Sequence, residues 1–132
     1  MKIMRQETIC YEVEIPEKLD EFRDWTFSSG GRIGEDFRVF ARLFKKFIKS
    51  NLSEDTTLVS YSVGHYYVSG FIEKEGRLVY FSISDVRYFH GEWCKDILVR
   101  TAKYIKDYSG GINYHTDIEC FHAAVDKMLA IE

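Results

Sequence analysis

The sequence has little of what marks a fibrous, disordered or membrane-spanning protein. It contains one proline among 132 residues, no low-complexity tract, and no apolar run near the roughly 18 residues that a membrane span needs. The net charge at pH 7 is only −3, so no overall field attracts nucleic acid or an anionic membrane. The N-terminal residues interrupt their apolar side chains with charge, so we expect no signal peptide.

Cysteine is also scarce. Cys10, Cys94 and Cys120 are an odd number at wide spacing, which is a poor disulfide framework. Few and scattered cysteines are typical of proteins kept in a reducing compartment. We therefore expect unpaired cysteines and a cytoplasmic location.

What the sequence does contain is enough apolar surface for one hydrophobic core. Hydrophobic residues make up 45% of the chain and aromatic residues 16%, with 10 Phe and 9 Tyr. A chain of this length usually forms one domain, and this composition closes a core without disulfide or metal support. We predict a single domain over residues 1–132.

Residue patterns with a period of two predict the strands. The expected strands are 8–15, 58–63, 66–72, 78–84 and 96–101. Short connections that contain glycine separate the three central segments, which predicts successive antiparallel hairpins. The first segment ends at the only proline, Pro16, and a short helix is expected over Glu17–Trp25.

Two longer segments have the helical period. Phenylalanines recur at helical spacing across 35–51 and must face a core. A second helix is expected over 117–131, opened by a capping box that pairs Thr116 with Glu119. Together the elements predict an α+β fold, in which two long helices (35–51 and 117–131) are packed on one face of an antiparallel sheet of about five strands.

Charge is distributed unevenly along the chain. Residues 1–31 carry a net charge of −3, residues 32–51 carry +4, and residues 52–132 carry −4. On the helix expected over 35–51, four cations fall opposite the Phe stripe: Arg38, Arg42, Lys45 and Lys49. Such a row suits phosphates or an acidic protein surface. The alternative is the ordinary solvated face of an amphipathic helix.

A second candidate surface follows the last predicted strand. Cations alternate with tyrosines before a diglycine, at Arg100, Lys103, Tyr104, Lys106 and Tyr108. Aromatic rings stack on bases while cations meet the backbone, so this pattern suits single-stranded nucleic acid. We expect 107–113 to be a mobile, exposed loop at the partner-binding edge, with Tyr108 as an interface anchor. In the alternative, Tyr108 folds back on the sheet and the loop is a plain connector.

The histidines and cysteines do not form a motif of specific spacing. His90 and Cys94 form one local group, and His115, Cys120 and His122 form another, but neither has the spacing of a zinc site. His122 lies among apolar residues, which favours a core histidine with a hydrogen-bond partner. We predict no metal and no cofactor. A small enzyme that uses Cys94, His90 or His115 stays open as an alternative.

One segment can be compared with known proteins: residues 79–121 read VYFSISDVRYFHGEWCKDILVRTAKYIKDYSGGINYHTDIECF. This third of the chain resembles small uncharacterised accessory proteins carried by phages and integrated mobile elements of Gram-positive bacteria. The likeness rests mainly on ILVRTAKYIKDYSGG, and the helix expected over 35–51 does not contribute to it. The resemblance implies an accessory protein, a group in which some members inhibit host defence nucleases. It assigns no activity, catalytic residue or cofactor to this segment.

The sequence therefore predicts a non-enzymatic binding or inhibitor-type protein that docks on a larger macromolecular partner, and the resemblance implies one of the anti-defence kind found in phages and mobile elements. A protein or nucleoprotein partner is expected, and no membrane. The candidate partner-binding residues are Arg38, Arg42, Lys45, Lys49, Arg100, Lys103, Tyr104, Lys106 and Tyr108. Direct nucleic-acid binding is the first alternative, and a small enzyme of unknown reaction is the second.

Overall fold

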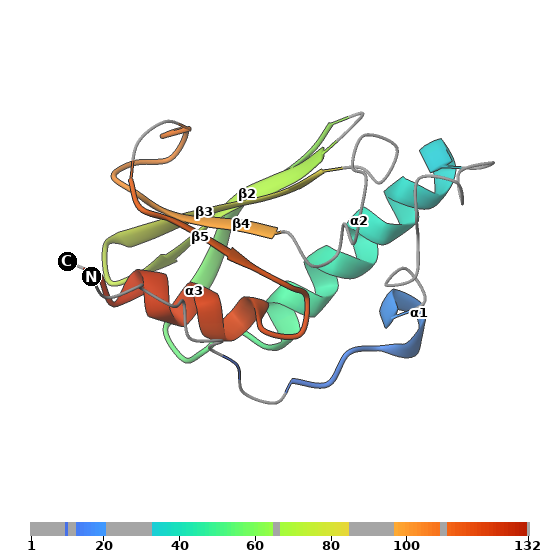
Figure 1. The fold of residues 1–132 in the computed structure, drawn as a ribbon, viewed down its shortest axis with the longest axis horizontal. Helices are drawn as coiled ribbons and strands as arrows, with labels where there is room; N and C mark the ends of the chain where they lie inside the picture. The colour runs from blue at the N-terminus through green and yellow to red at the C-terminus, as the bar shows by residue number, and fades with distance from the viewer. Residues whose placement is uncertain are drawn as a thin grey trace, which may run out of the picture.

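The computed structural model describes residues 10, 13–20, 33–64, 67–84, 97–108 and 111–131. This part of the chain contains eight helices and strands. In chain order they are α1 (Glu17–Asp20), α2 (Ile33–Ser50), β1 (Thr56–Val63), β2 (Tyr67–Lys74), β3 (Arg77–Ser84), β4 (Ile97–Ala102), β5 (Asn113–Thr116) and α3 (Phe121–Leu129). The strands form one sheet in the order β1-β2-β3-β4-β5, and neighbouring strands are antiparallel. The predicted α+β fold is confirmed (Figure 1).

Short connections join the first three strands, as the glycine positions predicted. Glu75 and Gly76 link β2 to β3, and their φ angles are +51° and +82°. Two successive residues with positive φ are typical of a type I′ turn, whose twist matches that of the flanking strands. The turn fixes the register, in which Lys74 pairs with Arg77 and Phe71 with Tyr80.

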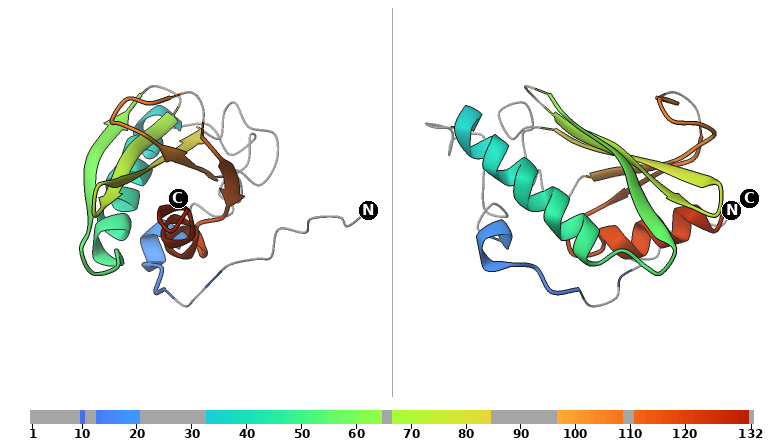
Figure 2. Two further views of the ribbon diagram at one scale, coloured as in Figure 1. Left: turned by 90° about the vertical axis from the view of Figure 1, so that its left-hand side faces the viewer. Right: turned by 180° about the vertical axis from the view of Figure 1, so that it is seen from behind.

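Both long helices cover the same face of the sheet, which we call the inner face. The buried stripe of α2 consists of Phe40, Ala41, Phe44, Phe47 and Ile48. It joins one hydrophobic core with the residues of β3 and β4 that alternate inward, such as Phe81 and Val99. Figure 1 shows α2 and α3 on one side of the sheet, and Figure 2 (left) shows the sheet curving around α3.

The outer face carries the residues that alternate with these. Phe71 of β2 pairs with Tyr80 of β3, and Tyr80 pairs with Arg100 of β4. Because side chains on adjacent strands share a face when they are directly paired, the three lie in a row across the middle of the sheet. This row is the floor for the loop that follows β4.

The predicted strand at 8–15 is wrong for the residues described there. Cys10 and residues 13–16 belong to neither a helix nor a strand, and the fifth strand of the sheet is β5. Val13 and Ile15 are partly buried against the core, whereas Glu14 between them is exposed. The alternation therefore belongs to an extended segment with one side on the core. Residues 21–25 of the short predicted helix lie outside the described residues.

The last helix begins later than the capping box predicted. Residues 113–116 pair with β4, so the chain must turn after Thr116 before a helix can start. The carboxylate of Asp117 accepts the N–H of Cys120 at 2.9 Å, and Cys120 is the N-cap without a side-chain cap of its own. The predicted capping box is therefore wrong, and α3 covers 121–129 of the predicted 117–131.

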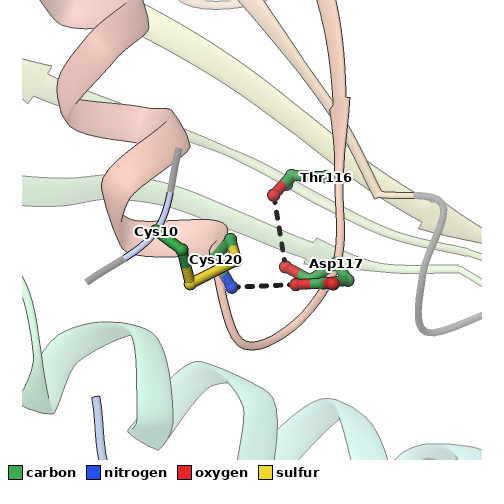
Figure 3. Close-up of a disulfide and its surroundings, with 4 residues drawn as sticks. All are labelled: Cys10, Thr116, Asp117 and Cys120. Carbon is green, nitrogen blue, oxygen red and sulfur yellow. Dashed lines mark hydrogen bonds between the residues drawn. A yellow bond between two sulfur atoms is a disulfide. The ribbon is translucent and has the colours of Figure 1, made fainter. Parts of the chain in front are cut away.

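A disulfide joins Cys10 to Cys120, whose Cα atoms are 4.5 Å apart (Figure 3). The expectation of unpaired cysteines is wrong for this pair, because the fold brings together two residues that are 110 positions apart. The bond ties the N-terminal segment to the start of α3. Further along that segment, Leu19 of α1 is buried in the core against α2. Cys94 lies outside the described residues.

His122 is a core histidine with a hydrogen-bond partner, as predicted, and it connects α3 to α2. Its ring is buried, meets the ring of Phe47 edge to face with centroids 4.9 Å apart, and places Nε2 3.0 Å from the carbonyl of Ile48. Because a carbonyl only accepts hydrogen bonds, Nε2 carries the proton. Burial lowers the pKa of His122, and the bond to Ile48 and the charge of Asp126 offset only part of that effect.

The buried histidine predicts a pH-dependent stability. A folded-state pKa below the ordinary 6.5 means that the unfolded chain takes up the proton first, so stability is full above pH 6.5 and is lost as pH falls below it. We expect the free energy of unfolding to fall from this group as the pH drops below 6.5, with a slope of at most about 1.4 kcal/mol per pH unit. Denaturant titrations of the wild type and His122→Gln should show a shallower dependence in the variant. Parallel pH profiles would contradict the assignment.

Candidate functional site

The predicted partner-binding residues fall on two separate surfaces. The first contains the predicted Arg38, Arg42, Lys45 and Lys49; with Lys46, which the prediction did not include, they form the α2 cation row, and all five are exposed. The second is the aromatic loop, residues 103–112, of which 109 and 110 lie outside the described residues. Because α2 lies on the inner face and the aromatic loop lies over the outer face, the sheet separates the two surfaces (Figure 1).

The aromatic loop concentrates exposed apolar side chains. Tyr104 is 62% exposed, Ile105 45%, Tyr108 57% and Ile112 55%. They are four of the seven large hydrophobic residues that are exposed in the described part of the chain. Single exposed apolar residues are ordinary, but a group on one surface segment is typical of an interaction site. Lys103 and Lys106 are exposed in the same loop.

A buried arginine and a buried aspartate hold the loop in place. The guanidinium of Arg100, which is only 8% exposed, lies 4.7 Å from the centre of the Tyr80 ring and donates through Nη2 to the carbonyl of Asp107 at 3.0 Å. The carboxylate of Asp107 accepts the N–H of Lys103 at 3.0 Å, and the N–H of Asp107 donates to the carbonyl of Tyr104 at 3.0 Å. Within the described structure, Arg100 therefore acts as an internal support of the loop.

Tyr108 lies on the outer face of the sheet and is exposed at the same time. Its ring centroid is 5.8 Å from that of Phe71 and 5.6 Å from that of Tyr80, and the Phe71 and Tyr80 centroids are 5.2 Å apart. Such a cluster of rings stabilises the loop by burial of Phe71 and by favourable ring geometry. The two predicted roles of Tyr108, interface anchor and packing residue, are therefore compatible in one side chain.

The far end of the loop is fixed by glycine geometry. Gly111 has a φ of +87°, and a Cβ at that position would collide with the carbonyl of Thr101. The N–H of Ile112 donates to Oγ1 of Thr101 at 2.8 Å, and the N–H of Thr101 donates to the carbonyl of Ile112 at 3.2 Å. The expectation of an exposed loop over 107–113 is wrong at both ends, because Asp107 is buried and Asn113 begins β5.

The α2 cation row is exposed, as the helical spacing predicted. Its central residues line a shallow hollow of about 380 Å³ together with Ser50. Nζ of Lys45 lies 5.6 Å from the centre of the Tyr61 ring in β1. Burial raises the pKa of Tyr61, so the phenol stays neutral and donates a hydrogen bond to the carbonyl of Ala41. This contact joins β1 to α2 beneath the row.

The row is not what helix stability alone favours. Like charges three or four residues apart on a helix are destabilising by a few tenths of a kcal/mol each at low salt, whereas alternating Glu and Lys would stabilise the helix by a similar amount. The sequence from Arg38 to Ser53 contains five cations and no acid. A ligand that bears negative charge would remove the repulsion.

The other candidate residues do not assemble into a catalytic or metal centre within the described structure. Cys120 is in the disulfide, His122 is buried against Ile48, and His115 is exposed on β5. No group of three metal-ligating side chains occurs among the described residues, and none of the described helices is long and apolar enough to cross a membrane. His90 and Cys94 lie outside the residues that the structure describes.

Sequence reasoning missed several residues that define the aromatic loop. Ile105 lies between Lys103 and Lys106, and Ile112 follows a diglycine, so neither was singled out as an interface residue. Two isoleucines in a turn-rich stretch are nevertheless a usable signal. Asp107 and Phe71 carried no signal, because their roles depend on contacts with Lys103 and Tyr108 that only the fold creates.

Comparison of the chain with protein-family models, with curated proteins and with solved structures finds no match.

The support of the loop by Asp107 can be tested by substitution. Asp107→Ala removes the acceptor of the Lys103 amide and is expected to lower the free energy of unfolding by about 1–3 kcal/mol. Asp107→Asn keeps a side-chain carbonyl in the same place and should recover most of the loss. Hydrogen exchange should speed up at the Lys103 amide in the alanine variant alone. An alanine variant with unchanged stability and unchanged exchange would contradict this role.

Proposed function

We propose that this chain is a non-enzymatic binding protein that docks on a larger protein partner through the aromatic loop. The observation that carries the proposal is the group of exposed apolar residues, Tyr104, Ile105, Tyr108 and Ile112, on a loop held by buried contacts. Loop residues that are already anchored by internal contacts lose less entropy on binding, so more of their contact energy appears as affinity.

The chemistry of the loop suits a protein partner better than a nucleic acid. Protein interfaces combine aromatic anchors at the centre with charged groups at the rim, which is the combination of Tyr104 and Tyr108 with Lys103 and Lys106. The nucleic-acid alternative for this surface also needs the charge of Arg100. That guanidinium is buried and engaged with Tyr80 and Asp107, which leaves two exposed cations for phosphates.

The identity of the partner is part of the proposal. The resemblance of residues 79–121 to phage and mobile-element accessory proteins makes a bacterial defence nuclease the first candidate. A cytoplasmic location belongs to the same proposal, and the Cys10–Cys120 disulfide stands against it because disulfides persist mainly in oxidising compartments.

The proposal is tested by removing the exposed apolar groups that make no described internal contact. Tyr104→Ser with Ile105→Ser should weaken binding to the partner by about 30-fold or more, the usual effect of losing interface hot spots. The matched control is Val59→Ser with Val63→Ser, which removes two exposed apolar side chains of β1. A partner captured from a Gram-positive host lysate is purified, and its Kd is measured by calorimetry with the wild type and both variants.

Unchanged Kd in the loop variant would overturn the proposal, as would an equal loss in the β1 control. Sedimentation of the wild type alone provides a further check. If the chain forms a dimer that the loop variant cannot form, the loop binds a second copy of the chain, and a separate protein partner is contradicted.

A further inference from the structure

We propose that the α2 cation row is a binding site for the phosphate backbone of a double-stranded nucleic acid. The row lies on the inner-face side of the molecule, away from the aromatic loop. The inference is therefore independent of the protein partner proposed above, and either one can fail without the other.

The first argument is the length and density of charge. Arg38 and Lys49 are 11 residues apart on one helix, which places them about 16 Å apart along its axis. Duplex DNA carries one negative charge per about 1.7 Å of axis when both strands are counted, so a stretch of this length holds about ten phosphate charges, of which those on the facing side of the duplex are within reach of the row. Arg38, Arg42, Lys45 and Lys49 lie along one side of the helix with Lys46 beside them, and together they can neutralise several of these charges at once.

The second argument is the hollow in the middle of the row. The described side chains that line it are Arg42, Lys45, Lys46, Lys49 and Ser50. Every charged group among them is positive, so no carboxylate of the described lining competes with an anion for their N–H donors. Phosphate oxygens accept such charge-assisted hydrogen bonds strongly.

The third argument separates nucleic acid from an acidic protein. The centre of a protein interface is depleted in lysine and needs apolar or aromatic anchors. The row has three lysines, and no large hydrophobic side chain of α2 is exposed among those described. Phosphate binding needs no apolar centre, because its affinity comes mainly from the release of counterions. The row therefore has the composition of a backbone-binding surface.

Described acidic side chains border the row at Lys46. Glu14, Glu17 and Lys46 help to line a groove of about 510 Å³ between the N-terminal segment and α2. Lys46 thus lines both the groove and the hollow, and it shares the groove with these two glutamates and with Lys18. The strongest phosphate contacts should therefore come from Arg42, Lys45 and Lys49.

The test is a fluorescence anisotropy titration of the full chain with a short labelled DNA duplex. Wild-type affinity should fall by about 100-fold or more between about 50 mM and about 200 mM salt, the loss expected for four or five phosphate contacts. Arg42→Glu with Lys49→Glu should weaken binding about tenfold or more at the lower salt and make the salt slope shallower by about two. Arg42→Gln with Lys49→Gln should show a smaller loss in the same direction.

The matched control is Lys103→Glu with Lys106→Glu, which changes the net charge by the same amount on the aromatic loop. It should bind the duplex within about threefold of the wild type, because exposed charges beyond a Debye length are largely screened. Thermal unfolding of each variant confirms that it is folded, and the glutamine pair supplies the test if the glutamate pair does not fold.

Three results would overturn the proposal. The first is a wild type that fails to bind the duplex at the lower salt, or that binds it without salt dependence. The second is a loop variant that loses as much affinity for the duplex as the α2 variant. The third is binding of polyglutamate to the row while the duplex does not bind, which would assign the row to an acidic protein surface instead.

Discussion

The ring of Phe44 in α2 contacts both the sheet and the neighbouring helix α3. Its centroid lies 6.1 Å from that of Phe81 in β3 and 5.5 Å from that of Phe121 in α3, and the Phe81 and Phe121 centroids are 5.4 Å apart. All three pairs meet at steep angles, between 64° and 85°, which is the edge-to-face geometry that aromatic rings prefer. The cluster fixes α2 and α3 on the inner face, and so determines which side of α2 faces water.

The two candidate surfaces follow from this constraint. With its phenylalanines directed at Phe81, α2 can place its cations only on the solvent side. Strand alternation then puts Tyr80, the neighbour of Phe81, on the opposite face, where Arg100 and Tyr108 meet it. The α2 cation row thus bears charge with no exposed large hydrophobic residue among the described side chains of α2, and the outer face bears exposed apolar groups on a supported loop. Surfaces of such different chemistry suit partners of different classes.

Strong periodicity made much of the fold predictable, and long-range contacts made the rest unpredictable. The helix over 35–51 and the three central strands repeat their pattern over many residues, so their positions and exposed faces could be predicted. The pattern at 8–15 alternates equally well, but its described residues, 10 and 13–15, belong to no strand of the sheet. Thr116 was predicted to cap a helix because the local sequence does not show its place in β5. That place depends on its pairing with Ile97, which is far away in the sequence. The burial of Arg100 and Asp107 depends on Tyr80 and on the loop geometry, which no local pattern encodes.

The coupling between Phe44 and Phe121 is the most direct test of how α2 and α3 are held together on the inner face. In a double-mutant cycle, Phe44→Leu, Phe121→Leu and the double variant are unfolded by denaturant and compared with the wild type. The edge-to-face contact predicts a coupling energy of about 0.5–1.5 kcal/mol, with the double variant less destabilised than the sum of the single variants. Single effects that add to within about 0.3 kcal/mol would show that the rings do not interact and would contradict the account.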